Sequence, residues 1–489
     1  MGTKISVCTR SVVAFVVLVG WFSVSPSRMT AQSIAAGQKA VYNSSNNVTG
    51  STAWVDLSAW WSVSGLGIPD LCALIRTNVL TSTYGSMSFY PNGTVIDARG
   101  LAYGVSGNPQ QIACSVDPFG ALAGPPPSTT ILLPSGNILT TQTWTLPNNT
   151  RIVGDQQQTV IKAVDPSTTV PFSGSYIIEM GGVDATSNKN LCPTVGSSPL
   201  CTSVGIEHLQ LGGGGTGAGV GGIQNQYSGA GSYVNDVNME NFSLTGLSIT
   251  AANSGPYSNI VYIAKSTCGS SGCRCIDVKA QTQGIHGVTC IGNTTTHGLD
   301  QGAGILVNAS NNSLEDVHIE AFWDGIEVGT SGTVANVLLS NITGTTTGSG
   351  DTAAPTKNTV HLCGGNSLDS GLGTCASHGT LQDITVLHAM NFSGPNTTTV
   401  VDDVTKNAIV SCDSGSSTPG CAVPLSTGMY ALGEPDAGAG TGAHGPYSMF
   451  TSSPTTPNGY YQNNPPASSY MPTWGVGNTS AATNPDDAR

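Results

Sequence analysis

The stretch SLEDVHIEAFWDGIEVG, from Ser313 to Gly329, concentrates groups that can transfer protons. It holds five acidic residues and one histidine in seventeen positions, whereas only 9% of the whole chain is charged. Carboxyl and imidazole groups commonly act as general acids and bases. His318, Glu320 and Asp324 are therefore candidate catalytic residues.

The same stretch belongs to an internal repeat. LEDVHIEAF (Leu314–Phe322) matches VNDVNMENF (Val234–Phe242) at its apolar and its acidic positions. The alternation of apolar and polar residues returns at intervals near twenty or forty residues, in VANVLL (Val334–Leu339), LQDITV (Leu381–Val386), IEHLQL (Ile206–Leu211) and CRCIDV (Cys273–Val278). Short strands of period two without hairpin signals indicate a parallel β-solenoid of the all-β class, in which stacked coils share one core.

Asp316 occupies a position of the repeat that holds Asp236, Asn336 and Asp383 in other copies. Asp and Asn tolerate the left-handed backbone conformation and form hydrogen bonds with nearby backbone groups. The recurrence therefore predicts a structural role for Asp316, within a polar ladder on the outside of the solenoid.

His318 and Glu320 do not recur, and alternation places them outward when Val317 and Ile319 point inward. In the copy CRCIDV the corresponding outward positions hold Asp277 and Lys279. Neighbouring strands lie about 4.8 Å apart, so direct stacking predicts a charged row of Glu240, Lys279 and Glu320 with Asp277 and His318 beside it. We take Asp277, Lys279, His318, Glu320 and Asp324 as one candidate site. The alternative is a salt-bridged outer face with no catalytic role.

Charge narrows the classes of partner. The chain carries a formal net charge of −13. Nucleic acids and anionic membranes need a basic footprint, so neither is an expected partner. The oligomeric state stays open.

The ends of the chain predict four segments. Residues 1–31 combine Lys4, Arg10 and an apolar run, which is typical of a secretory signal peptide, and we expect an exported, soluble protein, secreted, periplasmic or at the cell surface. Residues 32–84 are an expected N-terminal cap with a short helix, for which Asp70 is the N-cap. Residues 85–421 are the expected β-helix domain, and residues 422–489 an expected C-terminal capping segment with a flexible tail.

Twelve cysteines remain after the signal segment, an even number that fits disulfides in an exported protein. The motif CGSSGCRC matches no standard zinc spacing. Sequential pairing is the natural arrangement in a fold of local contacts, and it predicts the bonds Cys72–Cys114, Cys192–Cys201, Cys268–Cys273, Cys275–Cys290, Cys363–Cys375 and Cys412–Cys421.

The N-terminal part resembles the pectate-lyase-like superfamily, in the form found in secreted bacterial proteins. The residues that carry the resemblance are GTVIDARGL (Gly93–Leu101), ILLPSGNIL (Ile131–Leu139), TLPNNTRIVGD (Thr145–Asp155) and TVIKA (Thr159–Ala163). The resemblance implies a single-stranded right-handed parallel β-helix. It does not imply one activity, because the superfamily includes lyases, hydrolases, epimerases and non-catalytic surface proteins.

The resemblance implies two possible functions. The first is an enzyme acting on a polysaccharide. A lyase would use Ca²⁺ held by carboxylates and a base, for which Lys279 is the candidate, whereas a glycosidase needs two carboxyl groups. Asp402–Asp403 is another candidate pair, although the family's Arg-x-Lys motif is absent from the chain. The second function is a non-catalytic solenoid that binds carbohydrate or builds cell-surface structure.

Overall fold

The structure is a computed structural model. It describes residues 38–42, 48–56, 70–80, 94–99, 111–120, 129–165, 168, 170–182, 191–195, 198–214, 219–264, 273–292, 303–345, 356, 358–363, 379–392, 398–402, 408–412 and 430–433. The expected signal peptide lies outside these residues, as does Asp403.

Two long sheets make up most of the described structure. The large sheet has seventeen strands: β1 (Gln38–Tyr42), β2 (Val48–Asp56), β3 (Thr94–Asp97), β4 (Gln111–Cys114), β5 (Thr129–Leu132), β6 (Gly136–Thr140), β8 (Thr150–Val153), β9 (Thr159–Ala163), β13 (Gly205–Gly212), β15 (Tyr233–Phe242), β17 (Tyr257–Ala264), β19 (Ile285–Ile291), β21 (Asn312–Glu320), β23 (Thr333–Thr345), β25 (Thr380–Asn391), β27 (Ala408–Cys412) and β28 (Tyr430–Gly433). The small sheet has nine: β7 (Gln142–Leu146), β10 (Ser173–Met180), β14 (Gly221–Asn225), β16 (Leu247–Ile249), β18 (Ile276–Val278), β20 (Ala303–Val307), β22 (Asp324–Val328), β24 (Asn358–Leu362) and β26 (Thr398–Asp402).

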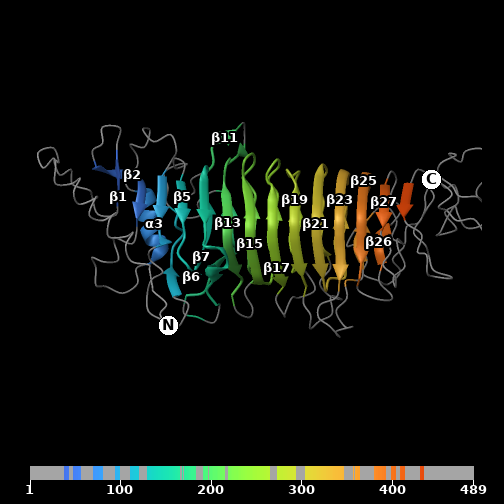
Figure 1. The fold of residues 1–489 in the computed structure, drawn as a ribbon, viewed down its shortest axis with the longest axis horizontal. Helices are drawn as coiled ribbons and strands as arrows, with labels where there is room; N and C mark the ends of the chain where they lie inside the picture. Colours follow the sequence, from blue (N-terminus) through green and yellow to red (C-terminus); the bar gives the residue numbers. More distant parts are fainter. Residues whose placement is uncertain are drawn as a thin grey trace, which may run out of the picture.

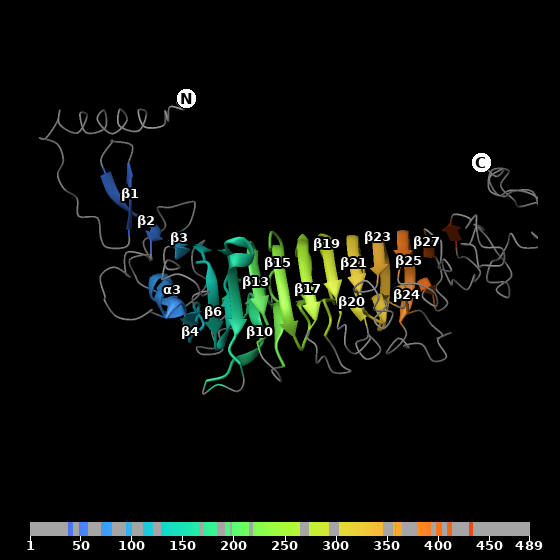
Figure 2. The same cartoon turned by 60° about the horizontal axis from the view of Figure 1, so that its bottom comes forward.

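The chain alternates between the two sheets, and strands that follow one another in a sheet pair in parallel, for example β19 with β21 and β20 with β22. Figure 1 shows the strands of the large sheet side by side in chain order, and Figure 2 shows strands of the small sheet as a second layer beside them. The predicted parallel β-helix is confirmed. Antiparallel pairing joins β1 to β2 and β11 (Thr194–Val195) to β12 (Ser198–Pro199).

A bend divides each long strand of the large sheet into two arms. In the first coils the arms are separate strands, since β13 pairs with β8 through Gly205–Glu207 and with β9 through Gln210–Gly212. From β13 onward a single residue with positive φ joins the two arms. These residues are skipped in the strand pairing and stack in one column: His208, Asp236, Asn259, Gly287, Asp316, Asn341 and His388, with φ between 53° and 61°.

Asp316 therefore lies in the left-handed conformation predicted for it, with φ 56°, and it accepts a 2.6 Å hydrogen bond from Asn341 Nδ2. The prediction that Asn336 and Asp383 occupy the same column as Asp316 is wrong. These two residues stack on each other in a second column, five residues before Asn341 and His388 in the chain, and Asn336 Nδ2 donates a hydrogen bond to Asn311 Oδ1. Both columns combine Asx residues with alternating apolar residues, so the sequence pattern alone could not separate them.

The spacing of the repeat also differs from expectation. Register pairs Val237 with Ile260 and Val288 with Val317, so successive coils are 23 and 29 residues long at these places. The coils differ because their connections differ in length. An alignment at a fixed interval therefore slips out of register with the stack.

The core is one continuous cluster of inward-facing side chains, most of them aliphatic. One of its rows crosses the large sheet through residues that are 1% exposed or less: Leu209, Val237, Ile260, Val288, Val317 and Ile342. Each coil buries its own row only against its neighbours, which is why the repeat needs stacking.

At the N-terminal side, helix α3 (Leu71–Leu80) adds Leu71, Cys72 and Ile75 to the core. Asp70 Oδ1 accepts a 2.9 Å hydrogen bond from the Ala73 amide, so the predicted N-cap is confirmed. A 3₁₀ helix, η3 (Gln156–Gln158), precedes β9. Strand β28 lies beyond the boundary expected at residue 421 and pairs with β27.

Three predicted disulfides are confirmed: Cys72–Cys114, Cys192–Cys201 and Cys275–Cys290. Cys273 and Cys363 are also disulfide-bonded. Their predicted partners Cys268 and Cys375 lie outside the described residues, as does Cys421. The bonds fit an oxidising compartment. In the part of the chain that the structure describes, no helix is long and apolar enough to span a membrane.

Candidate functional site

The five candidate residues do not form one row, because they belong to different sheets. His318 and Glu320 lie on β21 of the large sheet, where His318 pairs with Thr289 and Thr343. The predicted stacking of Asp277 and Lys279 on His318 and Glu320 is wrong. CRCIDV contains a strand of the small sheet, and both sheets have the same alternation of apolar residues.

On the large sheet, His318 and Glu320 contact each other. The distance from His318 Nε2 to Glu320 Oε1 is 2.7 Å, and Thr345 Oγ1 lies 3.4 Å from the same nitrogen. Glu240 is in the column of Glu320, but Ile263 and Ile291 lie between them. His318 and Glu320 therefore form a local pair and not part of a charged row.

On the small sheet, Asp277, Lys279 and Asp324 come together with residues that sequence reasoning missed. Strand pairing aligns Ser248, Asp277, Leu306, Glu327 and His361 in one outward column that crosses five successive coils. Inward neighbours such as Ile276, Ile305 and Ile326 alternate with them. The column places Asp277 two strands from Glu327, with Leu306 between.

A second column begins each of these strands. Asp324 pairs with Ala303 and Asn358. Ile276 and Ile305 are register partners. Arg274 and Ala303 each lie two residues before these isoleucines, so Arg274 belongs to the same column as Ala303. Coils therefore present Arg274 with Asp277, Ala303 with Leu306, and Asp324 with Glu327. An apolar coil separates two polar ones.

The Asp324 cluster, defined as Asp324, Glu327, Asn358 and His361, is buried. Asp324 Oδ1 accepts a 2.7 Å hydrogen bond from Asn358 Nδ2, and Oδ2 lies 3.1 Å from His361 Nδ1. Asp324, Glu327 and His361 are 1%, 5% and 0% exposed. Burial, reinforced by the negative charge and hydrogen bond of Asp324, raises the pKa of Glu327 to about 8, against an opposing effect of His361 and Arg274. The environment therefore favours the protonated form of Glu327.

The Asp277 cluster, defined as Asp277, Arg274 and Lys279, lies across Leu306 from it. Lys279 Nζ is 2.6 Å and an Arg274 terminal nitrogen is 3.9 Å from Asp277 Oδ2. Among the described atoms, Asp277 Oδ1 and Arg274 Nε are buried with no hydrogen-bond partner. The Arg274 side chain is 27% exposed and that of Lys279 50%, so the cluster reaches the surface through its two cations.

Glu327, His361 and Arg274 were missed, although the sequence contains a signal for them. Most small-sheet strands share a residue order of small, apolar, variable, apolar: GLSI, CIDV, GILV, GIEV and TVHL, while GIQN has the buried Asn225 at the last position. The variable position is the outward column. At Gly325 the initial position must be glycine, because a Cβ there would lie 2.5 Å from the Thr359 carbonyl oxygen.

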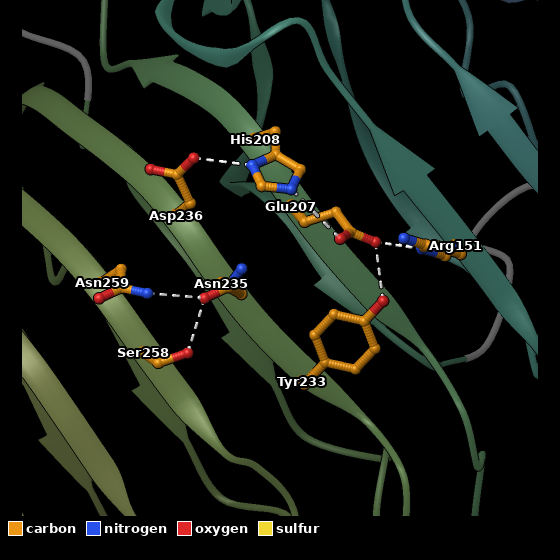
Figure 3. A network of polar contacts seen from close by, with 8 residues as sticks. All are labelled: Arg151, Glu207, His208, Tyr233, Asn235, Asp236, Ser258 and Asn259. Atoms are coloured by element: carbon orange, nitrogen blue, oxygen red, sulfur yellow. Dashed lines mark hydrogen bonds and ion pairs between the residues drawn. The ribbon is translucent and has the colours of Figure 1, made fainter.

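A different polar network lies on the outer face of the large sheet (Figure 3). Glu207 is its centre, hydrogen-bonded by Arg151 and, at 2.8 Å, by Tyr233 Oη. His208 Nδ1 lies 2.7 Å from Asp236 Oδ2. Burial acts to raise the pKa of Glu207, but the hydrogen bonds from Arg151 and Tyr233 outweigh it and the pKa is lowered. Burial and the hydrogen bond to Glu207 raise the pKa of Tyr233 to about 12. The polar groups of this network bond to one another, which is typical of a structural role.

In the ranges that the structure describes, no group of three or more His, Cys, Asp or Glu side chains could hold a metal ion. Asp402 lies on β26, while Asp403 is outside the described residues.

Solved structures with similar folds are parallel β-helix proteins. They include PfbA, a surface adhesin of Streptococcus pneumoniae (12% identity, 60% of this chain, 79% of that chain, TM-score 0.36), and the A-module of mannuronan C-5 epimerase AlgE4 from Azotobacter vinelandii (12% identity, 60% and 86%, TM-score 0.26). Endo-xylogalacturonan hydrolase from Aspergillus tubingensis is a third (11% identity, 60% and 80%, TM-score 0.33).

The chain has a parallel β-helix fold, which its own parallel sheets establish. The neighbours include a hydrolase, an epimerase and an adhesin, so the comparison leaves the activity open. No family model and no curated protein gives a significant match to the sequence.

Proposed function

We propose that the protein hydrolyses glycosidic bonds of a polysaccharide on the outer face of the small sheet. Glu327 donates a proton to the leaving oxygen. Asp277 takes a proton from the water that attacks the anomeric carbon, and the bond between this carbon and the leaving oxygen breaks. Each proton has a source and an acceptor, so no cofactor is needed.

The observation that carries the proposal is the column in which Asp277 and Glu327 stand two strands apart. Two strand spacings correspond to about 9.6 Å between their backbones. In inverting glycosidases the carboxyl groups are separated by roughly 6.5–9.5 Å, which leaves room for water, whereas retaining enzymes need roughly 5–5.5 Å. The spacing therefore favours inversion of the anomeric configuration.

The environments of the two carboxyl groups fit different roles. The pKa of Glu327 is raised to about 8 by burial and by Asp324, so it holds a proton at neutral pH. Asp277 has the positive charges of Lys279 and Arg274 beside Oδ2, and its Oδ1 has no hydrogen-bond partner among the described residues. That oxygen is buried and has unfilled hydrogen-bonding capacity.

A lyase reaction with Lys279 as base is less well supported. Its Nζ lies 2.6 Å from Asp277 Oδ2, so the amine is held in an ion pair and is not directed at a substrate. The burial of Asp324, Glu327 and His361 favours a second candidate, a non-catalytic solenoid in which the cluster is structural. The two candidates differ in whether products are formed.

The test is release of reducing ends from a panel of neutral and acidic polysaccharides by the full chain and by Glu327→Gln and Asp277→Asn. We expect each variant to lose at least about 100-fold in rate, the lower range for general acid–base catalysis. Glu320→Gln on the large sheet is the matched control and should keep the rate. The rate should fall as pH rises through about 8, because Glu327 then loses its proton.

The first product should have inverted anomeric configuration by NMR. Full activity in Glu327→Gln would refute the assignment of the acid. Binding of a polysaccharide without any product from the panel would instead support the non-catalytic solenoid.

A further inference from the structure

Three partly exposed side chains lie on the N-terminal side of the outward column that contains Asp277. Strand pairing continues this column from Ser248 to Gln224 and then to Glu179. Ser248 and Asp277 are each only 4% exposed. In contrast, Glu179, Gln224 and the nearby Tyr227 are partly exposed. This part of the outer face of the small sheet is therefore within reach of a ligand in solution.

Glu179 and Gln224 have unfilled hydrogen-bonding capacity. They are register partners on β10 and β14, and both point outward because Ile178 and Ile223 beside them are buried in the core. In the part of the chain that the structure describes, neither side chain has a hydrogen-bond partner, although the two groups are neighbours. Burial raises the pKa of Glu179, with no contribution from a charged group of that part. A partly shielded acid without a partner is a feature of functional sites.

The side chains of Glu179 and Tyr227 converge at Gly182. A Cβ on Gly182 would lie 3.7 Å from Glu179 Oε2 and 3.8 Å from Tyr227 Cδ2. Glycine adds no side chain between the two groups. The fold therefore brings a carboxyl group and an aromatic ring to one place on the accessible part of the small sheet.

Tyr227 is held in place from two sides. Its side chain packs against the hydrophobic core, and part of it stays exposed. Its carbonyl oxygen accepts a 2.7 Å hydrogen bond from the amide of Cys201, which is disulfide-bonded to Cys192. A side chain that is already fixed loses little conformational entropy when a ligand binds, so the ring is suited to bind one.

The chemistry of these groups fits a neutral sugar. The C–H groups on the face of a sugar ring pack on an aromatic ring, and the sugar hydroxyls bond carboxyl and carboxamide groups. The ionised form of Glu179 repels the carboxylate of an acidic sugar, and no described cation acts on it to offset this repulsion. The cations Arg274 and Lys279 lie beside Asp277, three strand spacings or about 14 Å away.

We propose that Glu179, Gln224 and Tyr227 form a distal subsite for a neutral sugar unit of the polysaccharide. The ring of Tyr227 packs on the sugar face, and the other two side chains bond its hydroxyls. The substrate class is then a neutral polysaccharide, and the net charge of −13 acts in the same direction because it repels a polyanion. The inference rests on the proposed function, since it adds a binding position to the same face of the small sheet.

The experiment measures binding by the full-length Glu327→Gln protein, which keeps the shape of the site and does not consume its ligand. Neutral polymers (xylan, mannan, β-glucan and arabinan) are compared with polygalacturonate by calorimetry at about 50 and 500 mM salt. We expect a neutral polymer to bind more tightly than polygalacturonate. Its affinity should change less than about twofold with salt, because screening acts only between charges.

Variants in the same background locate the ligand. Glu179→Ala should weaken binding about 10-fold or more, as expected for lost hydrogen bonds to a charged group. Tyr227→Leu keeps an apolar contact with the core but loses the aromatic face, so it should weaken binding several-fold. Glu240→Ala removes a partly exposed acid from the large sheet, and Phe392→Ala removes an exposed ring directly after β25. These two are the matched controls and should bind as the parent does.

The charge of Glu179 has a test of its own. Glu179→Gln removes the charge and keeps the size of the side chain. It should narrow the difference in affinity between the neutral polymer and polygalacturonate, because the repulsion of the sugar carboxylate is lost. An unchanged difference would show that Glu179 does not select against acidic sugars.

Three further results would overturn the inference. These are salt-sensitive binding of polygalacturonate in preference to all neutral polymers, neutral binding unchanged in Glu179→Ala and Tyr227→Leu, and no binding to any polymer. Cleavage of a polymer that depends on Glu327 but is unaffected by Glu179→Ala and Tyr227→Leu would refute the subsite and leave the proposed hydrolase standing. Glu179-dependent binding of a neutral polymer that the unmodified protein never cleaves would do the reverse.

Discussion

At the scale of single residues, the bend of the large sheet explains why a chain with few charges retains Asp and Asn at fixed places. Each bend needs one residue with positive φ, and Asp316 adopts 56°. Asx side chains reach this conformation more readily than other non-glycine residues. Asp316 is acidic within an acidic stretch, yet its place in the column of bend residues accounts for it without catalysis.

Replacing Asp316 tests this role. Asp316→Val should lower the free energy of unfolding by about 1–2 kcal/mol, because a β-branched residue is strained at positive φ. Asp316→Gly should be close to neutral. Urea unfolding of the purified protein measures both. Glu315→Val, one residue earlier on the same strand, is the control, and an equal loss at both positions would contradict the bend as the cause.

At the scale of elements, two kinds of strand share one alternation and differ in the polar groups that their outward positions carry. Strands of the large sheet have polar groups that bond across coils, as Asn235 accepts from Ser258 at 2.8 Å and Asn259 at 3.0 Å (Figure 3). Strands of the small sheet have the Asp277 and Asp324 clusters on their outer side. A solenoid can therefore have a structural polar face and a candidate active face built from the same repeat.

The network around Glu207 predicts sensitivity to acid. Because the pKa of Glu207 is lowered in the folded protein, its carboxylate stabilises the fold above the ordinary glutamate pKa near 4.5, and this stability is lost as pH falls through the lowered pKa. Glu207→Gln should lower the free energy of unfolding by about 1 kcal/mol at pH 7, since Arg151 is half exposed and water screens the pair.

The measurement is urea unfolding between pH 3 and 7. The difference between the unmodified protein and Glu207→Gln should shrink towards the acidic end. The same substitution at Glu240 on β15 controls for removal of one negative charge. A difference that is constant over the whole pH range would contradict the assigned role of the carboxylate.

At the scale of the whole molecule, stability comes from contacts between neighbouring coils. The strands succeed one another along the long axis (Figure 1), and the inward rows form one cluster. Disulfides between residues that are close in sequence fasten single coils of such a stack. Their contribution should depend on the length of chain that each one closes.

The three described disulfides span 42, 15 and 9 residues. Loop-closure entropy predicts that replacing both cysteines by alanine costs about 4, 3 and 2.6 kcal/mol for Cys72–Cys114, Cys275–Cys290 and Cys192–Cys201. Chemical denaturation of the three double variants measures the losses. Reversal of the order between the longest and the shortest loop would show that local packing outweighs chain entropy.

Loss of the Cys192–Cys201 bond should also affect binding. This bond anchors the backbone beside Tyr227, so its removal should weaken polysaccharide binding more than removal of Cys72–Cys114 does, under conditions in which both variants are folded.

The sequence by itself determined the fold class, because period-two alternation, a paucity of charge and recurring Asx residues are local properties of the chain. It also predicted the N-cap Asp70 and the three disulfides that the structure describes, since these join residues that are near neighbours among the cysteines. It singled out Asp277, Lys279 and Asp324, which lie on the same side of the molecule, although it grouped them through a mistaken alignment.

Only the tertiary structure decided which strand belongs to which sheet. Because the connections between coils differ in length, a repeat aligned by sequence places His318 beside Asp277. In the structure the neighbours of His318 are Thr289 and Thr343. Glu327 and His361 became visible as partners of Asp324 only when their coils were stacked, because thirty-four residues separate Glu327 from His361 in the chain and one strand spacing separates them in space. Proximity across coils is set by register, and register depends on the packing of the whole core.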